Sequence, residues 1–291
     1  MSAGPEPAPS TSAVPDGRRA RRARARARRR TSVVGVLGEV LITAGVLVLL
    51  FIAWQLWFTE WTVGSELNQA STQQSQEWNA QASARPSTSP STSPSTAPTG
   101  TPDPAEPTDP TDPTVTDPPV GTPVANAKRF GMLIVPRWGA DYYRPIAEGI
   151  GVTDVLNKGV LGHYPSTAMP GGVGNFAIAA HRMGHGGSLH YIHELQLGDN
   201  IYVETAEGWY EYQFRNLEYV RPSGVGVIDP VPQSPETPAT ERYITLTSCN
   251  PMYTSDERII AYGVYENFYP RDTSAPNNGA PDEIAATVGG A

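Results

Sequence analysis

The sequence predicts a mainly β domain, a small barrel or sandwich, preceded by one transmembrane helix and a disordered stalk. Three observations support this class. Nineteen residues without a charged side chain lie near the N-terminus, at Val40–Phe58. A Pro/Ser/Thr/Asp-rich segment follows them, and beyond it short β-branched and aromatic runs alternate with turn residues. We therefore divide the chain into five parts: a basic tail (1–32), an anchor (33–61), a linker (62–125), a β domain (126–269) and a flexible tail (270–291).

The apolar stretch is long enough to cross a membrane. At about 1.5 Å per residue, a helix over Val40–Phe58 spans roughly 28 Å, close to the hydrocarbon thickness of a bilayer. Trp54, Trp57 and Trp61 cluster where an interfacial aromatic belt would lie. A signal peptide is the competing interpretation, but its apolar region is only about 7–15 residues long, and no small-x-small cleavage site follows Phe58. We favour an uncleaved anchor.

The N-terminal arginines predict the orientation of this anchor. Nine of them lie between Arg18 and Arg30, shortly before the apolar stretch. Positive charge stays in the cytoplasm, so the β domain is expected to be extracellular on a single-pass anchor in the cell membrane. An arginine run could instead bind nucleic acid. However, residues 126–291 carry 11 Lys/Arg against 18 Asp/Glu, a net charge of −7, which argues against nucleic acid as a partner.

The segment between the anchor and the β domain is expected to be a stalk. Residues 62–81 are polar with weak helical propensity, and the chain from Ser83 to about Val124 is almost wholly Pro, Ser, Thr, Asp and Ala. Such a composition cannot bury enough apolar surface to offset the entropy lost on ordering, and its prolines favour extended polyproline II segments. The Pro/Gly/Ala/Asp-rich tail after residue 269 is expected to fray for a related reason.

The β domain is expected to contain many short strands and few helices. The strand-like runs are FGMLIVPRW (130–138), NFAIAAH (175–181), NIYVETAEGWYEYQFRNLEYV (200–220), RYITLTS (242–248) and RIIAYGVYENF (258–268). The third run predicts a hairpin that turns at residues 206–208. Helical spacing is confined to a short turn capped by Ser188 and to a second segment at Thr153–Leu161.

The chain has one cysteine, Cys249. Extracellular cysteines normally pair, so a lone thiol there is either buried and inert or kept for chemistry. Cys249 directly follows the RYITLTS run, and Arg258 opens the next run nine residues later. If the two runs are antiparallel neighbours, both residues lie near one edge of the sheet. His181 follows another strand where a Gly-rich loop begins, and strand ends of this kind present reactive side chains.

Cysteine, histidine and arginine would together suffice for acyl transfer. A thiolate is the nucleophile, and an imidazolium stabilises it and can protonate a departing amine. A guanidinium stays charged at physiological pH and can stabilise an oxyanion. Each residue taken alone also fits a structural role, because cysteine is among the most buried residue types and a strand-end His or Arg is commonly solvated. Spacing alone does not decide between these interpretations.

The wider motifs resemble those of the sortases of Gram-positive bacteria, most closely the class E type of high-GC actinobacteria. The residues that carry the resemblance are TLTSC with Arg258 downstream, NFAIAAHR, and GHYPSTAMPGGVGNF before it. The resemblance covers about residues 130–265. It implies an eight-stranded β-barrel with short helices. It also implies cleavage of an LAxTG- or LPxTG-like sorting signal between Thr and Gly through a cysteine thioester.

The resemblance further implies roles for individual residues. Cys249 matches the nucleophile, His181 the general acid/base, and Arg258 the clamp for the oxyanion and substrate. Substrate-binding roles are expected for Tyr164, Thr247 and Arg182. Class E members prefer LAxTG, a preference linked to a tyrosine near the groove; Tyr164 is the matching candidate, and Tyr142 and Tyr143 are alternatives.

The implied partners are secreted proteins with C-terminal sorting signals and a lipid-linked peptidoglycan precursor whose amine accepts the cleaved protein. No cofactor or metal is expected. A cysteine peptidase of the same fold, releasing its product to water, is an alternative because it shares the acyl-enzyme and differs only in the acceptor.

A His-rich metal-binding module is a second alternative. All five histidines lie between His163 and His193, and His181 and His185 have the i, i+4 spacing of zinc ligands. Against it, three glycines between residues 184 and 187 disfavour a helix there, and the chain has no His-Glu-x-x-His pattern. A non-catalytic wall-binding domain would not need a thiol, an imidazole and a guanidinium at strand ends.

Overall fold

The computed structural model describes residues 32–85 and 117–289, with the backbone alone for residues 55–61. The described strands are β1 (Arg129–Ile134), β2 (Tyr143–Glu148), β3 (Leu161–His163), β4 (Gly174–Ala179), β5 (Asn200–Glu204), β6 (Gly208–Val220), β7 (Arg242–Asn250) and β8 (Glu257–Pro270). The helices are α2 (Val33–Ala84) and α3 (Ala285–Val288), with 3-10 turns η1 (Pro136–Trp138), η2 (Leu156–Lys158), η3 (Ile192–Glu194), η4 (Val225–Ile228), η5 (Pro276–Gly279) and η6 (Asp282–Ile284).

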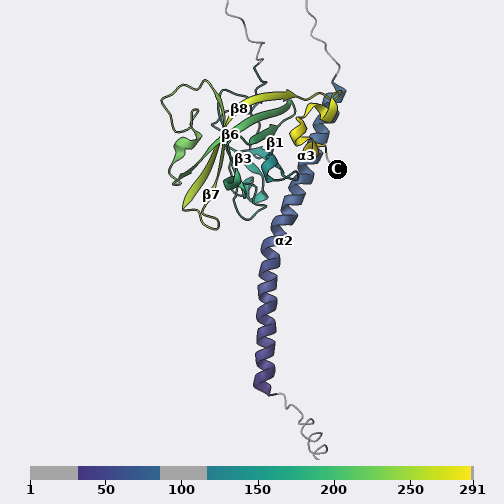
Figure 1. The fold of residues 1–291 in the computed structure, drawn as a ribbon, viewed down its shortest axis with the longest axis vertical. Helices are drawn as coiled ribbons and strands as arrows, with labels where there is room; N and C mark the ends of the chain where they lie inside the picture. The colour runs from purple at the N-terminus through teal and green to yellow at the C-terminus, as the bar shows by residue number, and fades with distance from the viewer. Residues whose placement is uncertain (1–31, 86–116, 290–291) are drawn as a thin grey trace, which may run out of the picture. The chain divides into compact units, whose positions relative to one another are not determined.

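The eight strands form a closed barrel in the order β1-β2-β3-β4-β7-β8-β6-β5 (Figure 1). Pairing of β5 with β1 closes it. Two of the pairings are parallel, β2 with β3 and β4 with β7, and the rest are antiparallel. The mainly β class expected from the strand runs and the eight-stranded barrel implied by the resemblance are therefore confirmed. Because the barrel is closed, it has no unpaired edge strand. The residues at the strand ends form its two rims.

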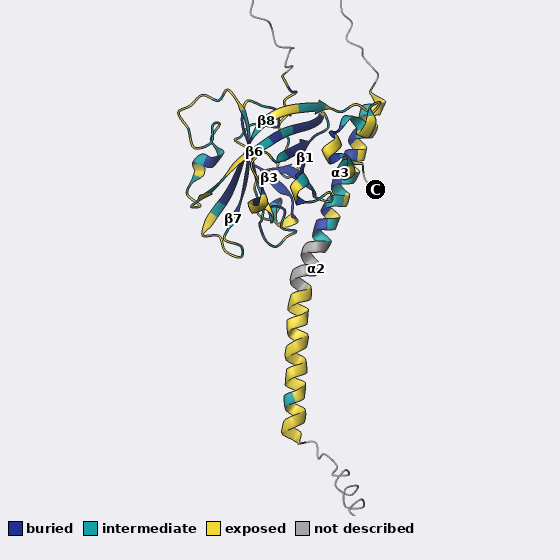
Figure 2. Cartoon of the chain, in the orientation of Figure 1, coloured by how far each residue is buried: buried dark blue, intermediate teal, exposed yellow. Residues whose placement is uncertain are grey.

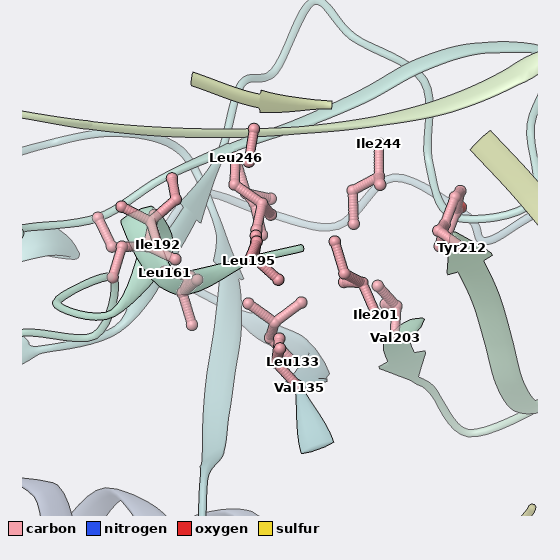
Figure 3. Close-up of a cluster of buried hydrophobic side chains, with 14 of the residues drawn as sticks. Leu133, Val135, Leu161, Ile192, Leu195, Ile201, Val203, Tyr212, Ile244 and Leu246 are labelled. Atoms are coloured by element: carbon pink, nitrogen blue, oxygen red, sulfur yellow. The ribbon is translucent and has the colours of Figure 1, made fainter. Parts of the chain in front are cut away.

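Alternating side chains fill the barrel. Leu133, Ile201, Val203, Ile244 and Leu246 come from three strands, β1, β5 and β7, and point into one cluster (Figure 3). These five side chains have no exposed surface. Since successive side chains of a strand point to opposite faces, the residues between these positions face outwards. This alternation decides which strand residues are available to a site on the outer wall.

The strand-like runs correspond to strands. The run at 130–138 contains most of β1, the predicted hairpin is β5 and β6, and the two runs around Cys249 are β7 and β8. The pattern did not reveal β2 and the three-residue β3. The helical segment predicted after Ser188 is η3, and Leu189, Ile192 and Leu195 are buried in the barrel cluster. The segment at 153–161 is helical only as the short turn η2.

One helix in the described part of the chain, over Val33–Trp54 of α2, is long and apolar enough to cross a membrane. Its side chains are almost all exposed, as the yellow part of α2 in Figure 2 shows. The compact units of the chain divide within α2, between Ala53 and Trp54. The second unit contains the C-terminal part of α2 together with the barrel.

Residues 62–84 differ from the linker predicted over 62–125. They are helical, and this part of α2 carries buried positions among intermediate and exposed ones (Figure 2). The buried positions recur with the helical period at Gly64, Leu67, Ser71, Ser75 and Trp78. Small and polar side chains make up most of this stripe, so it is not apolar enough to stand out in the sequence. The barrel wall supplies the partners that bury it. The predicted disordered segment at 86–116 and the basic tail at 1–31 lie outside the described residues.

The C-terminal segment differs from the flexible tail predicted for 270–291. Ala280 and Ile284 are buried against the outer face of β1, β5 and β6, in a cluster that also contains Trp78. Glu283 accepts hydrogen bonds from the Tyr202 hydroxyl at 2.7 Å and from the Asn200 amide at 2.8 Å. Ile284 and Glu283 thus hold this segment on the barrel. The Pro/Gly-rich composition of the segment gave no sign of these contacts.

Candidate active site

The strand pairing brings the predicted catalytic positions to one rim. Cys249 on β7 pairs with Arg258 on β8. On the other side of β7, Ala179 of β4 pairs in parallel with Thr247, and His181 and Cys249 each follow two residues later. The alignment continues beyond the end of β4, since the Ala180 N–H donates to the Thr247 carbonyl at 3.2 Å and the Ser248 hydroxyl donates to the Ala180 carbonyl at 2.8 Å.

The three positions also share one face of the wall. On β7 the even-numbered Ile244 and Leu246 point into the barrel, so Cys249 belongs to the outward set. On β8 the inward residues are Ile259 and Ala261, which places Arg258 outside. On the β4 side Ala180 is in the barrel cluster, and His181 follows on the outer side. Nucleophile, base and cation candidates thus face outwards at neighbouring strand ends, and Cys249 is half-buried there.

His181 is held by two loop residues. Its Nε2 lies 2.8 Å from Oδ1 of Asn157, a residue of η2, and its ring stacks on His185 with centroids 5.1 Å apart and planes 29° apart. With Asn157 Oδ1 as the acceptor, His181 Nε2 is the donor of this bond. Burial lowers the pKa of His181, and the charge of neighbouring His185 lowers it further.

We expect His185→Gln to raise the pKa of His181 toward its ordinary value of 6.5, because the substitution removes a neighbouring positive charge. A lowered pKa means that the folded state favours neutral His181. Its contribution to stability is therefore fully present above the ordinary pKa and is lost as the pH falls from there through the lowered pKa of the folded state. Ring NMR titration of the histidines in the intact chain, with His181→Asn to assign the signal, measures the change. A midpoint that stays put or moves to lower pH would contradict the effect of His185.

Arg182 is buried and binds the backbone next to the thiol. Its Nη1 donates to the Asn250 side-chain oxygen and, at 3.5 Å, to the Cys249 carbonyl. The guanidinium therefore ties the loop after His181 to the end of β7. Its expected contact with substrate stays a prediction.

Arg258 lies opposite Cys249, and its guanidinium makes solvent-exposed hydrogen bonds. Its Nη1 donates to the carbonyls of Ser255 and Glu257, both at 2.9 Å. These bonds fix the side chain through one nitrogen. The other nitrogens of the fork are the donors available to a developing oxyanion.

Tyr164 lies beside β7. Its hydroxyl is 3.1 Å from Thr247 Oγ1, and this threonine hydroxyl is 3.2 Å from the Ile178 carbonyl. The alternatives Tyr142 and Tyr143 are buried, and their hydroxyls bind the Ser188 carbonyl and the Glu204 carboxylate. Of these three tyrosines, Tyr164 is the one that bonds to the strand of the nucleophile.

Sequence reasoning missed Asn157 as a partner of His181. It is an exposed loop residue 24 positions upstream, in a segment assigned to a helix, and no motif marked it. The spacing of His181 and His185 indicates His185 only as a metal ligand. In the described ranges, no group of three or more His, Cys, Asp or Glu side chains could hold a metal ion. His163, buried with its Nδ1 2.8 Å from Glu148, belongs to the barrel wall rather than to this rim.

Comparison with known proteins identifies related chains. The family model described as "Sortase domain" matches residues 133–266. The chain is 34% identical over 265 residues to sortase SrtE1 of Streptomyces coelicolor, covering 88% of this chain and 64% of the length of that relative. It is 39% identical to the solved SrtA sortase from Actinomyces oris, with a TM-score of 0.54, covering 58% of this chain and 94% of that one. SrtF from Corynebacterium diphtheriae, 23% identical with a TM-score of 0.52 over 59% of this chain and 98% of that one, has the same fold.

Proposed function

The chain belongs to the sortase family, and on that premise we propose that it is a membrane-anchored cysteine transpeptidase. The observation that carries the proposal is the pairing of β4, β7 and β8, which aligns Cys249 with Arg258 on one side and with His181 on the other. A proposed substrate is a secreted protein whose C-terminal sorting signal is LAxTG- or LPxTG-like. The proposed acceptor is the amine of a lipid-linked peptidoglycan precursor.

The proposed reaction has two acyl-transfer steps. The Cys249 thiolate attacks the threonine carbonyl carbon, and Arg258 stabilises the oxyanion of the tetrahedral intermediate. Collapse breaks the Thr–Gly bond, the His181 imidazolium gives its proton to the departing glycine amine, and a thioester remains. The acceptor amine then attacks the thioester, His181 takes a proton from it, and the thiolate leaves. Asn157 and His185 hold the imidazole that serves both steps.

A mass assay of peptide products tests this function. The intact chain in detergent is mixed with peptides containing Leu-Ala-x-Thr-Gly or Leu-Pro-x-Thr-Gly, with and without an added amine. Cleavage between Thr and Gly with an amide product to the amine supports a transpeptidase. Free acid alone, at a rate that the amine does not change, would instead support the peptidase of the same fold. No cleavage of either signal peptide would refute the proposed activity.

We expect cleavage of Leu-Ala-x-Thr-Gly to be faster than that of Leu-Pro-x-Thr-Gly, and Tyr164→Phe to reduce this ratio about 2–10-fold, the value of one hydrogen bond. The substitution removes the bond to Thr247 that fixes the ring beside β7. Tyr269→Phe is the matched control, because its hydroxyl binds Glu211 near the opposite end of β8. If Tyr164→Phe leaves the ratio of the two cleavage rates unchanged, Tyr164 does not contribute to the preference for Leu-Ala-x-Thr-Gly.

We propose that the apolar part of α2 anchors the chain with its N-terminus in the cytoplasm. The length and hydropathy of Val33–Trp54 and the preceding arginines support this topology. Protease added outside wall-stripped cells is expected to digest the barrel and spare an N-terminal tag. Digestion of the tag with protection of the barrel would contradict this topology and place the N-terminus outside the cell.

A further inference from the structure

The side of α2 that packs on the barrel also contacts the two loops around His181. A Cβ atom placed on Gly159 would lie 2.7 Å from Leu67 Cδ1 and 2.5 Å from the His185 carbonyl oxygen. A Cβ atom placed on Gly186 would lie 2.9 Å from Val63 Cγ1 and 3.3 Å from Leu67 Cδ1. Two aliphatic side chains of the helix thus rest directly on two glycine backbones.

These glycines are close in sequence to the residues that hold the imidazole. Gly159 follows Asn157 by two residues, and Gly186 directly follows His185. Both glycines have positive φ, +75° and +87°, so they combine a left-handed backbone with a surface that admits the helix. The Ser188 hydroxyl donates to the Gly159 carbonyl at 2.5 Å and joins the two loops to each other.

Leu67 also packs beneath the loop that carries Asn157. It is buried in a cluster with Val155 and Val160, against which Leu156 and Val63 pack in turn. Leu156 is the residue before Asn157. The helix, the loop and the amide oxygen that binds His181 therefore form one continuous set of contacts.

A separate set of polar contacts fixes the helix on the barrel. The buried Glu204 carboxylate accepts from Ser75 of the helix at 2.6 Å and from Arg271 at 2.5 Å. Arg271 lies over the Trp78 ring, 5.6 Å from its centroid, and Asn68 of the helix bonds to the Tyr143 amide at 3.2 Å. These contacts set the rotation and the axial position of the helix, so Val63 and Leu67 meet the loops in a defined place.

We propose that residues 62–84 of α2 are a working part of the catalytic unit, in which Val63 and Leu67 are positioning residues that brace the loops holding His181. The brace acts on His181 through Asn157 and His185 and touches no substrate. This inference rests on the proposed function for its effect on rate, but its structural effect can be measured without any peptide.

The main test uses Leu67→Ala in the intact chain in detergent, with Gln69→Ala as control because Gln69 is exposed on the same helix. Leu67→Ala is expected to speed amide exchange in residues 155–160 and 184–188 and to raise the ring titration midpoint of His181 as the ring becomes more exposed. The titratable and charged groups at this rim are His185, which stacks on the ring, Arg182, which follows His181 in the chain, and Cys249 and Arg258 on the neighbouring strands. Cleavage of Leu-Ala-x-Thr-Gly at pH 7 is expected to fall roughly 10–100-fold, as for a misplaced catalytic group.

Two further variants separate bracing from loss of fold. Val63→Ala is the milder change, because Val63 is only partly buried, and Leu67→Ile should restore the wild-type titration and rate. Unchanged exchange and titration in Leu67→Ala and Val63→Ala, with native circular dichroism, would overturn the brace while leaving the proposed function intact. The converse result, altered exchange and titration in the variants when the wild-type chain itself cleaves neither Leu-Ala-x-Thr-Gly nor Leu-Pro-x-Thr-Gly, would support the brace and refute the function.

Discussion

Cys249→Ala is expected to reduce peptide cleavage about 10⁴-fold or more, to the level of the no-enzyme control, because no other side chain can form the thioester. Cys249 is the only cysteine of the chain. A thioester trapped on the wild-type protein and seen by mass spectrometry must therefore be on this residue, and it should be absent from the variant.

The same substitution should leave the fold intact. Cys249 is half-buried at the end of β7, and its backbone pairing with Arg258 does not depend on the sulfur. We expect a change in unfolding free energy within about 1 kcal/mol. Ser255→Ala is the control for the same rim, because Ser255 binds Arg258 through its backbone carbonyl, which the substitution keeps. Retained turnover in Cys249→Ala would contradict the assignment of Cys249 as the nucleophile. So would a result in which Ser255→Ala loses turnover and Cys249→Ala does not.

Glu204→Gln is expected to destabilise the protein by about 3–5 kcal/mol, which is the cost of leaving a buried charge without its partner. Glu204 and Arg271 form an ion pair at 2.5 Å whose side chains are 0% and 1% exposed. The carboxylate accepts from Ser75, Tyr143 and Arg271, so an amide in its place would point a donor at donors. Burial and the neighbouring carboxylate already raise the pKa of Tyr143, which keeps this hydroxyl protonated as a donor.

Thermal unfolding checks the size of this effect. For a unit of this length, the loss corresponds to a fall in Tm of roughly 6–20 °C. Glu207→Gln is the matched control, because Glu207 pairs with Arg85 at 3.7 Å with both side chains about half exposed or more. Such a surface pair contributes about 0–1 kcal/mol. Equal Tm values for the two variants would show that the buried pair of Glu204 and Arg271 does not stabilise the packing of α2 on the barrel.

Much of the candidate site followed from local patterns. A period of two placed β7 and β8, and their short connection made them antiparallel neighbours, so the pairing of Cys249 with Arg258 was predictable. The position of His181 needed the family resemblance, because β4 and β7 are separated by more than 60 residues and their parallel pairing leaves no mark on either run. Asn157 was not predictable, since its partner is chosen by the path of a loop.

Patterns among neighbouring residues are enough to predict the apolar stretch of α2, the strand runs and the residue types needed for acyl transfer. The extent of the helical part of α2 beyond the apolar stretch depends instead on contacts made in the folded protein. Gly64, Ser71 and Ser75 have no apolar surface to drive a helix into a core, and they are buried because the barrel offers a matching wall. The hydrophobic pattern of a segment indicates which of its faces can be buried. The partner that buries it comes from positions distant in sequence, as Glu204 does for Ser75 across 129 residues.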